Sequence, residues 1–128
     1  MTMETPGAEL LAPAVAGIDE AGAALAAACL YRAMGDPSRV AILRHLLLGE
    51  HNVAELTSHL GLAQSTVSKH LACLRDCGLV QSRPVRRSSV FTLTHPAAVV
   101  KVFAATEELL AATGDAVVLC TRTGTEAS

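Results

Sequence analysis

The stretch GLAQSTVSKHLACLRDCGLV, residues 61–80, decides how this chain folds. Val67, Leu71 and Leu74 recur at i, i+4 and i+7, which places them on one face of an α-helix. Gly78 follows, and glycine is the residue that most readily ends a helix with a positive φ. The stretch therefore predicts a turn, a helix with one buried face, and the start of a strand.

The other faces of this helix carry short polar side chains and one cation: Gln64, Ser65, Thr66, Ser68, Lys69 and His70. A helix with one buried face and a polar N-terminal half suits insertion into the major groove of DNA. We therefore expect these side chains to contact bases or the DNA backbone. The alternative is a helix face that is only solvated.

A shorter helix is expected immediately before this one. Asn52 starts it as the cap, with Glu55 three residues later in the pattern of a capping box, and Gly61 ends it. The next helix begins three residues after Gly61. This is the spacing of a helix-turn-helix.

Two further helices are expected upstream. The first spans residues 19–34 and is rich in Ala, a strong helix former. Asp36 and Pro37 mark the start of the second, because Asp caps a helix and Pro is tolerated at its first position. The second helix ends at Gly49, and its expected buried residues are Val40, Leu43 and Leu47.

After Gly78 the pattern changes to short β-prone runs. Residues 79–83 and 89–93 predict two strands on either side of a basic tip at residues 84–88, so that the hairpin forms a wing. Three arginines of this wing are expected to contact DNA phosphates rather than only to solubilise the chain: Arg83, Arg86 and Arg87.

A last helix opens at His95 and Pro96. Its apolar face is broad and comprises Val99, Val102, Phe103, Thr106, Leu109 and Leu110. One small domain does not need so wide a face, which predicts that a partner helix covers part of it.

The composition fits one domain that is mainly α with a small β-hairpin. Only 2% of the 128 residues are aromatic, so the core must be aliphatic. We expect a loosely ordered arm over residues 1–18, a folded domain over 19–112 and a flexible tail over 113–128. The net charge is −2, yet residues 64–95 carry five basic residues against one acidic residue, which suits a phosphate-facing surface.

Nothing in the sequence indicates export or a membrane span. No run of 18 apolar residues is free of charge or proline, which argues against a membrane-spanning helix. No basic region precedes the apolar N-terminal stretch, which argues against a secretory signal. Four cysteines in such a chain are more readily thiols or metal ligands than structural disulfides. The expected location is therefore the cytoplasm.

The order of helices and wing resembles the ArsR/SmtB family of winged helix-turn-helix repressors. The resemblance covers about residues 19–112, and the motifs that carry it are AMGDPSR at 33–39, LGLAQSTVSKHL at 60–71, Leu74 with Arg75, and GLV at 78–80. It implies a homodimer held by its first and last helices that binds an inverted repeat in operator DNA. It also implies release from DNA when an inducer, usually a metal ion, binds.

The usual metal ligands of the family are absent here. Residues 52–54 lack the cysteines of the family's Cys-x-Cys motif, and residues 99–106 of the last helix contain no His. Ala63 also stands where a capping Ser is common, and Arg87 where the wing often has Gly. The recognition helix is therefore expected to lack a side-chain cap.

Cys73 and Cys77 are spaced i, i+4 on the expected recognition helix, outside its apolar stripe and about 6 Å apart at Cβ. Two such cysteines with a third in the tail resemble the CmtR branch of the family, which responds to cadmium and lead. The resemblance implies Cys73, Cys77 and Cys120 as ligands, the last from the same or the partner subunit. A three-sulfur site favours Cd²⁺ or Pb²⁺, with arsenite and Zn²⁺ as the other candidate inducers.

Simpler roles are expected for the other cysteine and three histidines. Cys29 should pack in the interface of the first helix. The histidines have no metal-ligand spacing with one another and are expected to be ordinary surface or rim residues: His45, His51 and His59.

Two alternatives to a metal-responsive repressor stay open. One is a repressor of the same fold that responds to thiol oxidation. The other is a cysteine enzyme or a protein-binding helical domain. The enzyme interpretation is the weaker one, because no orienting acid, oxyanion donor or pocket accompanies the thiols, and the chain is therefore expected not to be an enzyme.

Overall fold

The computed structural model describes residues 19–119 of the chain. The chain divides into two compact units, residues 1–32 and residues 33–128. The first unit is represented by one helix, and the second contains the helix-turn-helix and the wing.

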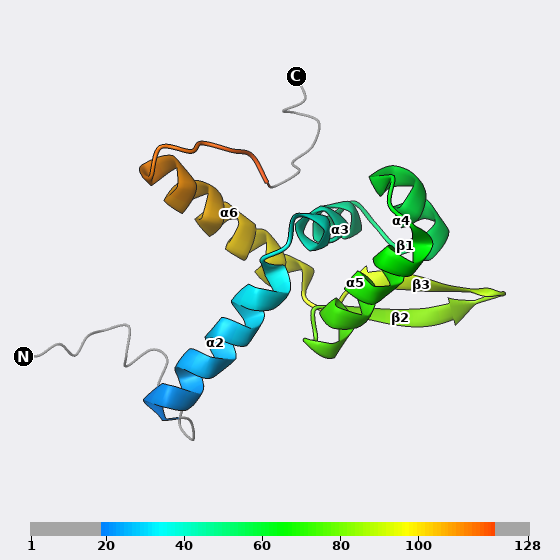
Figure 1. The fold of residues 1–128 in the computed structure, drawn as a ribbon, viewed down its shortest axis with the longest axis horizontal. Coiled ribbons are helices and arrows are strands. Elements are labelled where there is room, and N and C mark those ends of the chain that lie inside the picture. The colour runs from blue at the N-terminus through cyan, green and yellow to red at the C-terminus, as the bar shows by residue number, and fades with distance from the viewer. Residues whose placement is uncertain (1–18, 120–128) are drawn as a thin grey trace, which may run out of the picture. The chain divides into compact units, whose positions relative to one another are not determined.

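The helix of the first unit is α2, Glu20–Met34, whose last two residues belong to the second unit (Figure 1). Asp19 caps it by accepting the backbone N–H of Gly22 at 2.6 Å. Cys29 is exposed, and its sulfur lies 3.9 Å from Nη1 of Arg32. The helix predicted over residues 19–34 is therefore confirmed, while the packing of Cys29 in an interface stays a prediction.

The second unit contains four helices and three short strands within the described residues. In chain order they are α3 (Pro37–Leu47), β1 (His51–Asn52), α4 (Val53–Leu60), α5 (Gln64–Asp76), β2 (Val80–Val85), β3 (Ser88–Leu93) and α6 (Pro96–Ala112). This is the mainly helical winged helix-turn-helix that the sequence predicts.

The expected helix caps are present. Asp36 accepts the N–H of Ser38, and Pro37 occupies the first turn of α3. Asn52 and Glu55 form a reciprocal capping box at the start of α4, with both N–H···O distances 2.8 Å. Gly61 ends α4 in the left-handed conformation, with φ of 69°.

The sheet has the order β1-β3-β2 and is antiparallel throughout. Sequence reasoning missed β1, which consists of two residues and pairs His51 with Phe91 and Asn52 with Val90. A strand this short has no alternating pattern to detect, and only its partner β3 defines it.

The wing is longer, and its tip shorter, than predicted. Pro84 pairs with Ser89 and Val85 with Ser88, so only Arg86 and Arg87 form the turn. The predicted tip over residues 84–88 is therefore wrong in length. Pro84 lacks an N–H group, but this costs little on β2 because β2 is an edge strand of the sheet.

The core joins the four helices of the second unit to β2 and β3. Its buried members are Ile42, Leu43, Leu46, Leu56, Val67, Leu71, Leu74, Val80, Phe91, Leu93, Val99 and Phe103. All but the two phenylalanines are aliphatic, as the composition predicts.

The buried face of α3 differs from the predicted stripe. Ile42, Leu43 and Leu46 are buried, whereas Val40 and Leu47 are only partly buried. The reason is that α3 contacts α4, α5 and β3 together, so its buried surface is rotated from the predicted i, i+3, i+7 stripe.

The last helix, α6, anchors to the core through its first half. Val99 and Phe103 are buried, while Val100 and Leu109 are exposed, the latter by 68%. In the part of the chain that the structure describes, no helix is both long and apolar enough to cross a membrane.

Replacement of Leu71 by Ala tests the importance of the α5 stripe. The side chain is 1% exposed, so Leu71→Ala should lower the free energy of unfolding by about 2–5 kcal/mol, through lost burial and a residual cavity. Urea unfolding followed by circular dichroism measures this. Ser68→Ala on the exposed face of the same helix is the control and should change stability by less than about 0.5 kcal/mol.

Candidate nucleic-acid interface and thiol pair

Helix α5 turns one face into the protein and leaves the other to solvent. Val67, Leu71 and Leu74 are buried, as the sequence predicts. Ala63 occupies the N-cap without a side-chain hydrogen bond, which was also expected. Five of the six predicted DNA-contacting side chains are exposed on this helix: Gln64, Ser65, Thr66, Ser68 and Lys69.

His70, the sixth, is half-buried and contacts the start of α3. Its Nδ1 lies 3.2 Å from Nη1 of Arg39, and its Nε2 lies 3.6 Å from Oδ2 of Asp36. Arg39 also donates through Nε to the backbone carbonyl of Ala33. The ring thus joins two motifs that are far apart in the sequence, and its predicted contact with DNA stays a prediction.

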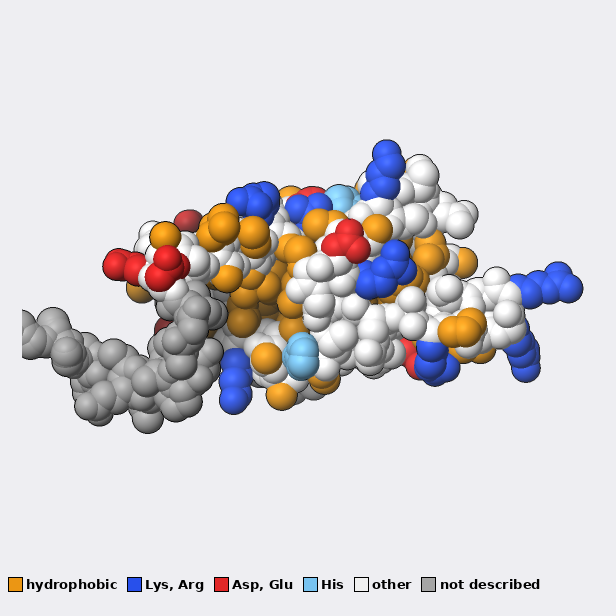
Figure 2. All heavy atoms as spheres, turned by 90° about the horizontal axis from the view of Figure 1, so that it is seen from below, with side chains coloured by type: hydrophobic (Ala, Val, Ile, Leu, Met, Phe, Trp, Pro, Cys, Tyr) orange, Lys and Arg blue, Asp and Glu red, His pale blue; other side chains and the backbone are white. Residues whose placement is uncertain are grey.

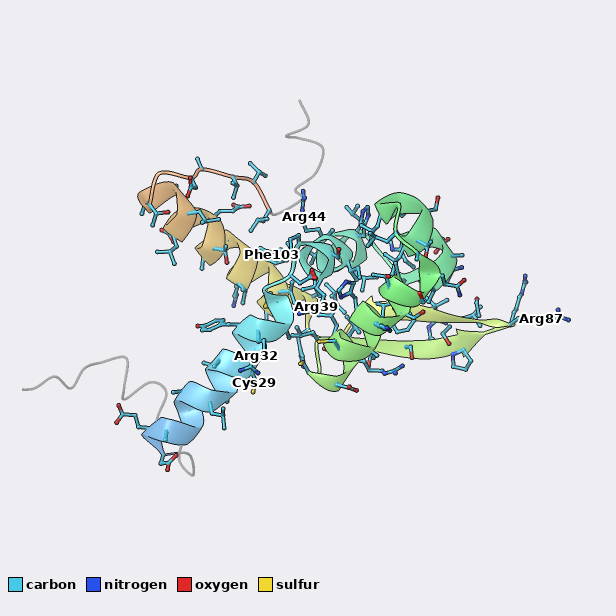
Figure 3. The ribbon with its side chains drawn as sticks, in the orientation of Figure 1. Cys29, Arg32, Arg39, Arg44, Arg87 and Phe103 are labelled. Atoms are coloured by element: carbon cyan, nitrogen blue, oxygen red, sulfur yellow. The ribbon has the colours of Figure 1, made fainter. Side chains whose placement is uncertain are left out.

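The wing presents its cations at and near the tip. Arg86 and Arg87 are exposed. Lys and Arg side chains project from the end of the second unit that carries the wing (Figure 2), and Arg87 points away from the hairpin (Figure 3). Arg83 lies farther from the tip and pairs with Glu50, with 2.6 Å between Nη2 and Oε1. Both partners are about half exposed, so the pair contributes at most about 1 kcal/mol and Arg83 remains accessible to a phosphate.

A hollow of about 310 Å³ lies between the wing and the helix pair. Its lining comes from the start of α4, the first residue of α5 and the wing: Asn52, Val53, Ala54, Gln64, Arg87, Ser88 and Ser89. Most of these side chains are small or polar, and one is a cation. The hollow therefore connects the exposed face of α5 to the wing by a surface suited to a sugar-phosphate backbone.

The thiols of Cys73 and Cys77 lie at the C-terminal end of α5. Cys73 is half-buried and Cys77 is exposed, and neither belongs to the core. The helix ends at Asp76, yet the N–H of Cys77 still donates to the carbonyl of Cys73 at 3.1 Å, so the i, i+4 relation holds. A helix C-terminus also carries partial negative charge, which favours a bound cation. These two accessible soft donors fit a thiophilic ion.

The chain after α6 returns to α3. The N–H of Leu119 donates to Oε2 of Glu107, and its carbonyl accepts from Nε of Arg44 at 3.1 Å. Its side chain packs against the core. Figure 1 shows this segment beside α3 and away from the C-terminal end of α5. Cys120, the predicted third ligand, lies outside the described residues.

Three histidines that were expected to be ordinary surface or rim residues without metal-ligand spacing lie together in space, so the expectation about their spacing is wrong. His45 on α3, His51 on β1 and His59 on α4 each place a ring nitrogen within 4.8 Å of the others. Burial, assisted by the nearby His59, His51 and Arg44, lowers the pKa of His45 below its usual value. Local spacing did not indicate the cluster, because the pairing of β1 with β3 brings His51 into place.

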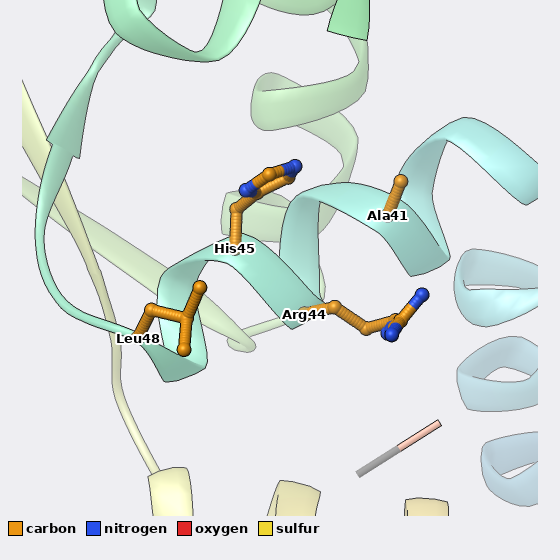
Figure 4. A pocket seen from close by; sticks show the side chains of 4 residues that line it. All are labelled: Ala41, Arg44, His45 and Leu48. Carbon is orange, nitrogen blue, oxygen red and sulfur yellow. The ribbon is translucent and has the colours of Figure 1, made fainter. Parts of the chain in front are cut away.

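His45 also borders a shallow pocket. The pocket has a volume of about 160 Å³ and is lined by Ala41, Arg44, His45 and Leu48 (Figure 4). Its walls come from about two turns of α3 and the C-cap residue Leu48. It is therefore a surface depression beside the histidines rather than an enclosed ligand cavity.

Comparison with known proteins identifies the family. Residues 36–82 match the family model described as "Bacterial regulatory protein, arsR family". The solved structure of HlyU from Vibrio cholerae N16961 is similar at 38% sequence identity and a TM-score of 0.58, over 65% of this chain and 92% of that chain. The chain belongs to the ArsR family. Members of this family are transcription regulators rather than enzymes, which confirms the family resemblance and the exclusion of an enzyme.

Two other regulators are similar to this chain over part of its length. The HTH-type transcriptional regulator CmtR of Mycobacterium tuberculosis is 54% identical over 55 residues, which is 43% of this chain and 47% of that protein. A probable mercury resistance operon repressor of Streptomyces lividans is 47% identical over 53 residues, 41% of this chain and 42% of that protein. The chain thus matches less than half the length of each of these relatives.

Thiol labelling tests the placement of the cysteines. A water-soluble alkylating reagent should modify Cys77 faster than Cys73 in the folded protein, because Cys77 is exposed and Cys73 half-buried. Mass spectrometry of proteolytic peptides measures both rates, and labelling in urea gives the reference in which the two rates converge. Equal protection of both thiols in the folded protein would contradict this placement.

Proposed function

We propose that this ArsR-family protein is a cytoplasmic transcriptional repressor that binds operator DNA as a homodimer and is released by a thiophilic ion. The observation that carries the proposal is the arrangement of α5. Its exposed face bears the polar residues Gln64–Lys69, its buried face fixes its rotation, and its C-terminal end carries two thiols.

DNA binding is supported by the surface around α5. The helix is long enough to lie in a major groove, where its amide and hydroxyl side chains meet base edges. Lys69, Arg86 and Arg87 then face phosphates on either side of the groove, with Arg83 behind the wing tip. Phosphate contacts position the protein, and contacts to base edges specify the sequence.

Dimer formation is supported by exposed apolar side chains on α2 and on α6. Leu25 and Tyr31 are 63% and 68% exposed on α2, and Leu109 is 68% exposed on α6. Exposed apolar side chains that gather into a patch mark interaction sites between proteins. A two-fold dimer through these helices presents two copies of α5, which requires an operator with inverted half-sites.

The inducer site is proposed at Cys73, Cys77 and Cys120, with Cd²⁺ or Pb²⁺ as the inducer. Thiolates are soft ligands, and a site of three sulfurs selects large soft ions over hard ones. The name of the Streptomyces relative refers to mercury, which is another thiophilic metal. Arsenite and Zn²⁺ are the remaining candidates.

The third thiol is proposed to come from the partner subunit. Cys120 directly follows Leu119, whose backbone is held by Glu107 of α6 and Arg44 of α3. This anchor lies away from the thiol end of α5 in the same chain (Figure 1). The partner's Cys120 therefore completes the site without release of these two hydrogen bonds.

Ion binding then opposes DNA binding because both events involve helix α5. Gathering thiolates at the C-terminal end of the helix ties it to the tail, so the helix no longer keeps the orientation that fits the groove. The ion shifts the equilibrium only if it binds the form that is off DNA more tightly. Such coupling between two sites is typically about 1–3 kcal/mol.

A metal signal is favoured over a disulfide between the two helix thiols. Residues at i, i+4 on a helix have Cβ atoms about 5–6 Å apart, whereas a disulfide needs about 3.5–4.5 Å. A metal ion bridges the wider separation without distortion of the backbone. Redox control would instead require a disulfide to Cys120.

The wing is tested by Arg87→Ala. Loss of one phosphate contact should weaken binding by a similar factor on operator DNA and on unrelated DNA. It should also reduce the magnitude of the slope of the logarithm of the DNA-binding constant against the logarithm of the salt concentration by about 1 per subunit. Fluorescence anisotropy with both duplexes at several salt concentrations measures this. Gln64→Ala is the comparison and should weaken operator binding selectively. A change in sequence preference for Arg87→Ala would contradict the phosphate role.

The sensor is tested by Cys73→Ser. This variant should bind operator DNA like the wild type but should not be released by Cd²⁺ or Pb²⁺, because one of three soft donors is missing. Operator release and thiolate-to-metal absorbance are followed in the same titration. Cys29→Ser is the matched control and should respond normally.

Release of the Cys73→Ser variant by these ions at wild-type concentrations would refute the thiol site. Release of the wild type by peroxide, without stoichiometric uptake of metal, would replace the metal signal by thiol oxidation. Absence of salt-dependent DNA binding by the wild type would refute the repressor proposal as a whole.

A further inference from the structure

The three histidines on α3, β1 and α4 form a cluster that the proposed repressor mechanism does not use. We propose that His45, His51 and His59 bind a divalent first-row transition ion of the Zn²⁺ class, at a site distinct from the thiol pair. The basis is the convergence of three ring nitrogens, all within 4.8 Å of one another.

The orientation of His51 supports this role. Its Nδ1 lies 2.8 Å from the backbone carbonyl of Gly49, so Nδ1 carries the hydrogen and donates it. The lone pair of the neutral ring is then on Nε2. Metal-binding histidines usually donate their second N–H to a carbonyl or carboxylate in this way, which fixes the tautomer and the ring orientation.

The distances require only a small closure. Ligand nitrogens about 2.0–2.1 Å from a tetrahedral Zn²⁺ lie about 3.3 Å apart. The cluster spans at most 4.8 Å, so each ring nitrogen moves by roughly 1 Å, which side-chain rotation supplies. His45 and His59 are stacked, with 4.9 Å between centroids and 8° between planes, and they tilt toward a common point on binding. His59 is exposed and is the ring with most freedom to move.

The chemistry of the donors selects the ion. Imidazole is a borderline ligand that suits Zn²⁺, Co²⁺, Ni²⁺ and Cu²⁺, whereas three thiolates suit Cd²⁺ and Pb²⁺. Three nitrogens leave a fourth tetrahedral position, which water fills on the exposed side of His59. The two sites therefore take different ions.

The position of the site gives the ion a mechanical role. His45 lies in the last turn of α3, His51 lies on the strand that pairs with β3 of the wing, and His59 lies on the first helix of the helix-turn-helix. An ion held by all three ties α3, β1 and α4 together at one point. It should stabilise the folded unit, because it binds the folded arrangement and not the unfolded chain.

The test uses full-length, tag-free protein in which Cys29, Cys73, Cys77 and Cys120 are all replaced by Ser. Isothermal titration with Zn²⁺ should show one ion per chain, and Zn²⁺ at about 100 times its Kd should raise Tm by roughly 10 °C. Co²⁺ should give a visible spectrum without a thiolate charge-transfer band. This background keeps the result independent of whether the thiol pair binds Cd²⁺.

Variants of the cluster then identify the ligands. His59→Gln and His51→Gln should each weaken Zn²⁺ binding by at least about 10-fold and remove most of the rise in Tm. His95→Gln is the matched control, because His95 is exposed at the start of α6 and makes no side-chain cap. His59→Gln changes an exposed residue, so its folding is expected to be normal and is checked by circular dichroism.

Two results would overturn the proposal. One is the absence of Zn²⁺ binding by the cysteine-free protein at micromolar concentrations. The other is equal Zn²⁺ affinity in the His59→Gln, His51→Gln and His95→Gln variants. Neither result bears on operator release by Cd²⁺, which is measured in the protein that retains its thiols.

Discussion

The burial of one apolar stripe on α5 is the constraint on which the rest of this structure depends. Val67, Leu71 and Leu74 are at most 1% exposed, and together they fix the rotation of the helix about its own axis. A change of one residue in register turns a helix by about 100°, which would carry this apolar stripe out of the core and move polar side chains toward it. Burial of these three side chains thus decides which polar side chains of α5 face solvent and on which side of the helix end the thiols lie.

Features that arise from a few neighbouring residues could be predicted from the sequence. The stripe on α5, the capping box of Asn52 and Glu55, and the left-handed Gly61 each depend on one local pattern and are present as expected. The hairpin also follows from local β propensity. Its tip was predicted too long, because Pro84 was assigned to the tip, whereas Pro84 pairs with Ser89 on an edge strand that accommodates it.

Features that depend on tertiary contacts could not be predicted in this way. The buried face of α3 is set by three neighbouring elements at once, so no single period describes it. The histidine cluster is assembled by a two-residue strand whose existence depends on β3. His70 shows the same limit, because its contacts with Arg39 and Asp36 cross a long stretch of chain. Sequence reasoning identified the thiols on one helix but not the imidazoles on three elements.

The turn at the wing tip couples charge to backbone conformation. Arg86 has φ of 58°, a left-handed conformation that glycine adopts without cost and other residues adopt at about 1 kcal/mol or more. Glycine at this position would relax the turn but would also remove a cation from the part of the hairpin that projects farthest. Stability of the hairpin and attraction to a polyanion therefore place opposite demands on one residue, and the chain has arginine there at the expense of a relaxed backbone.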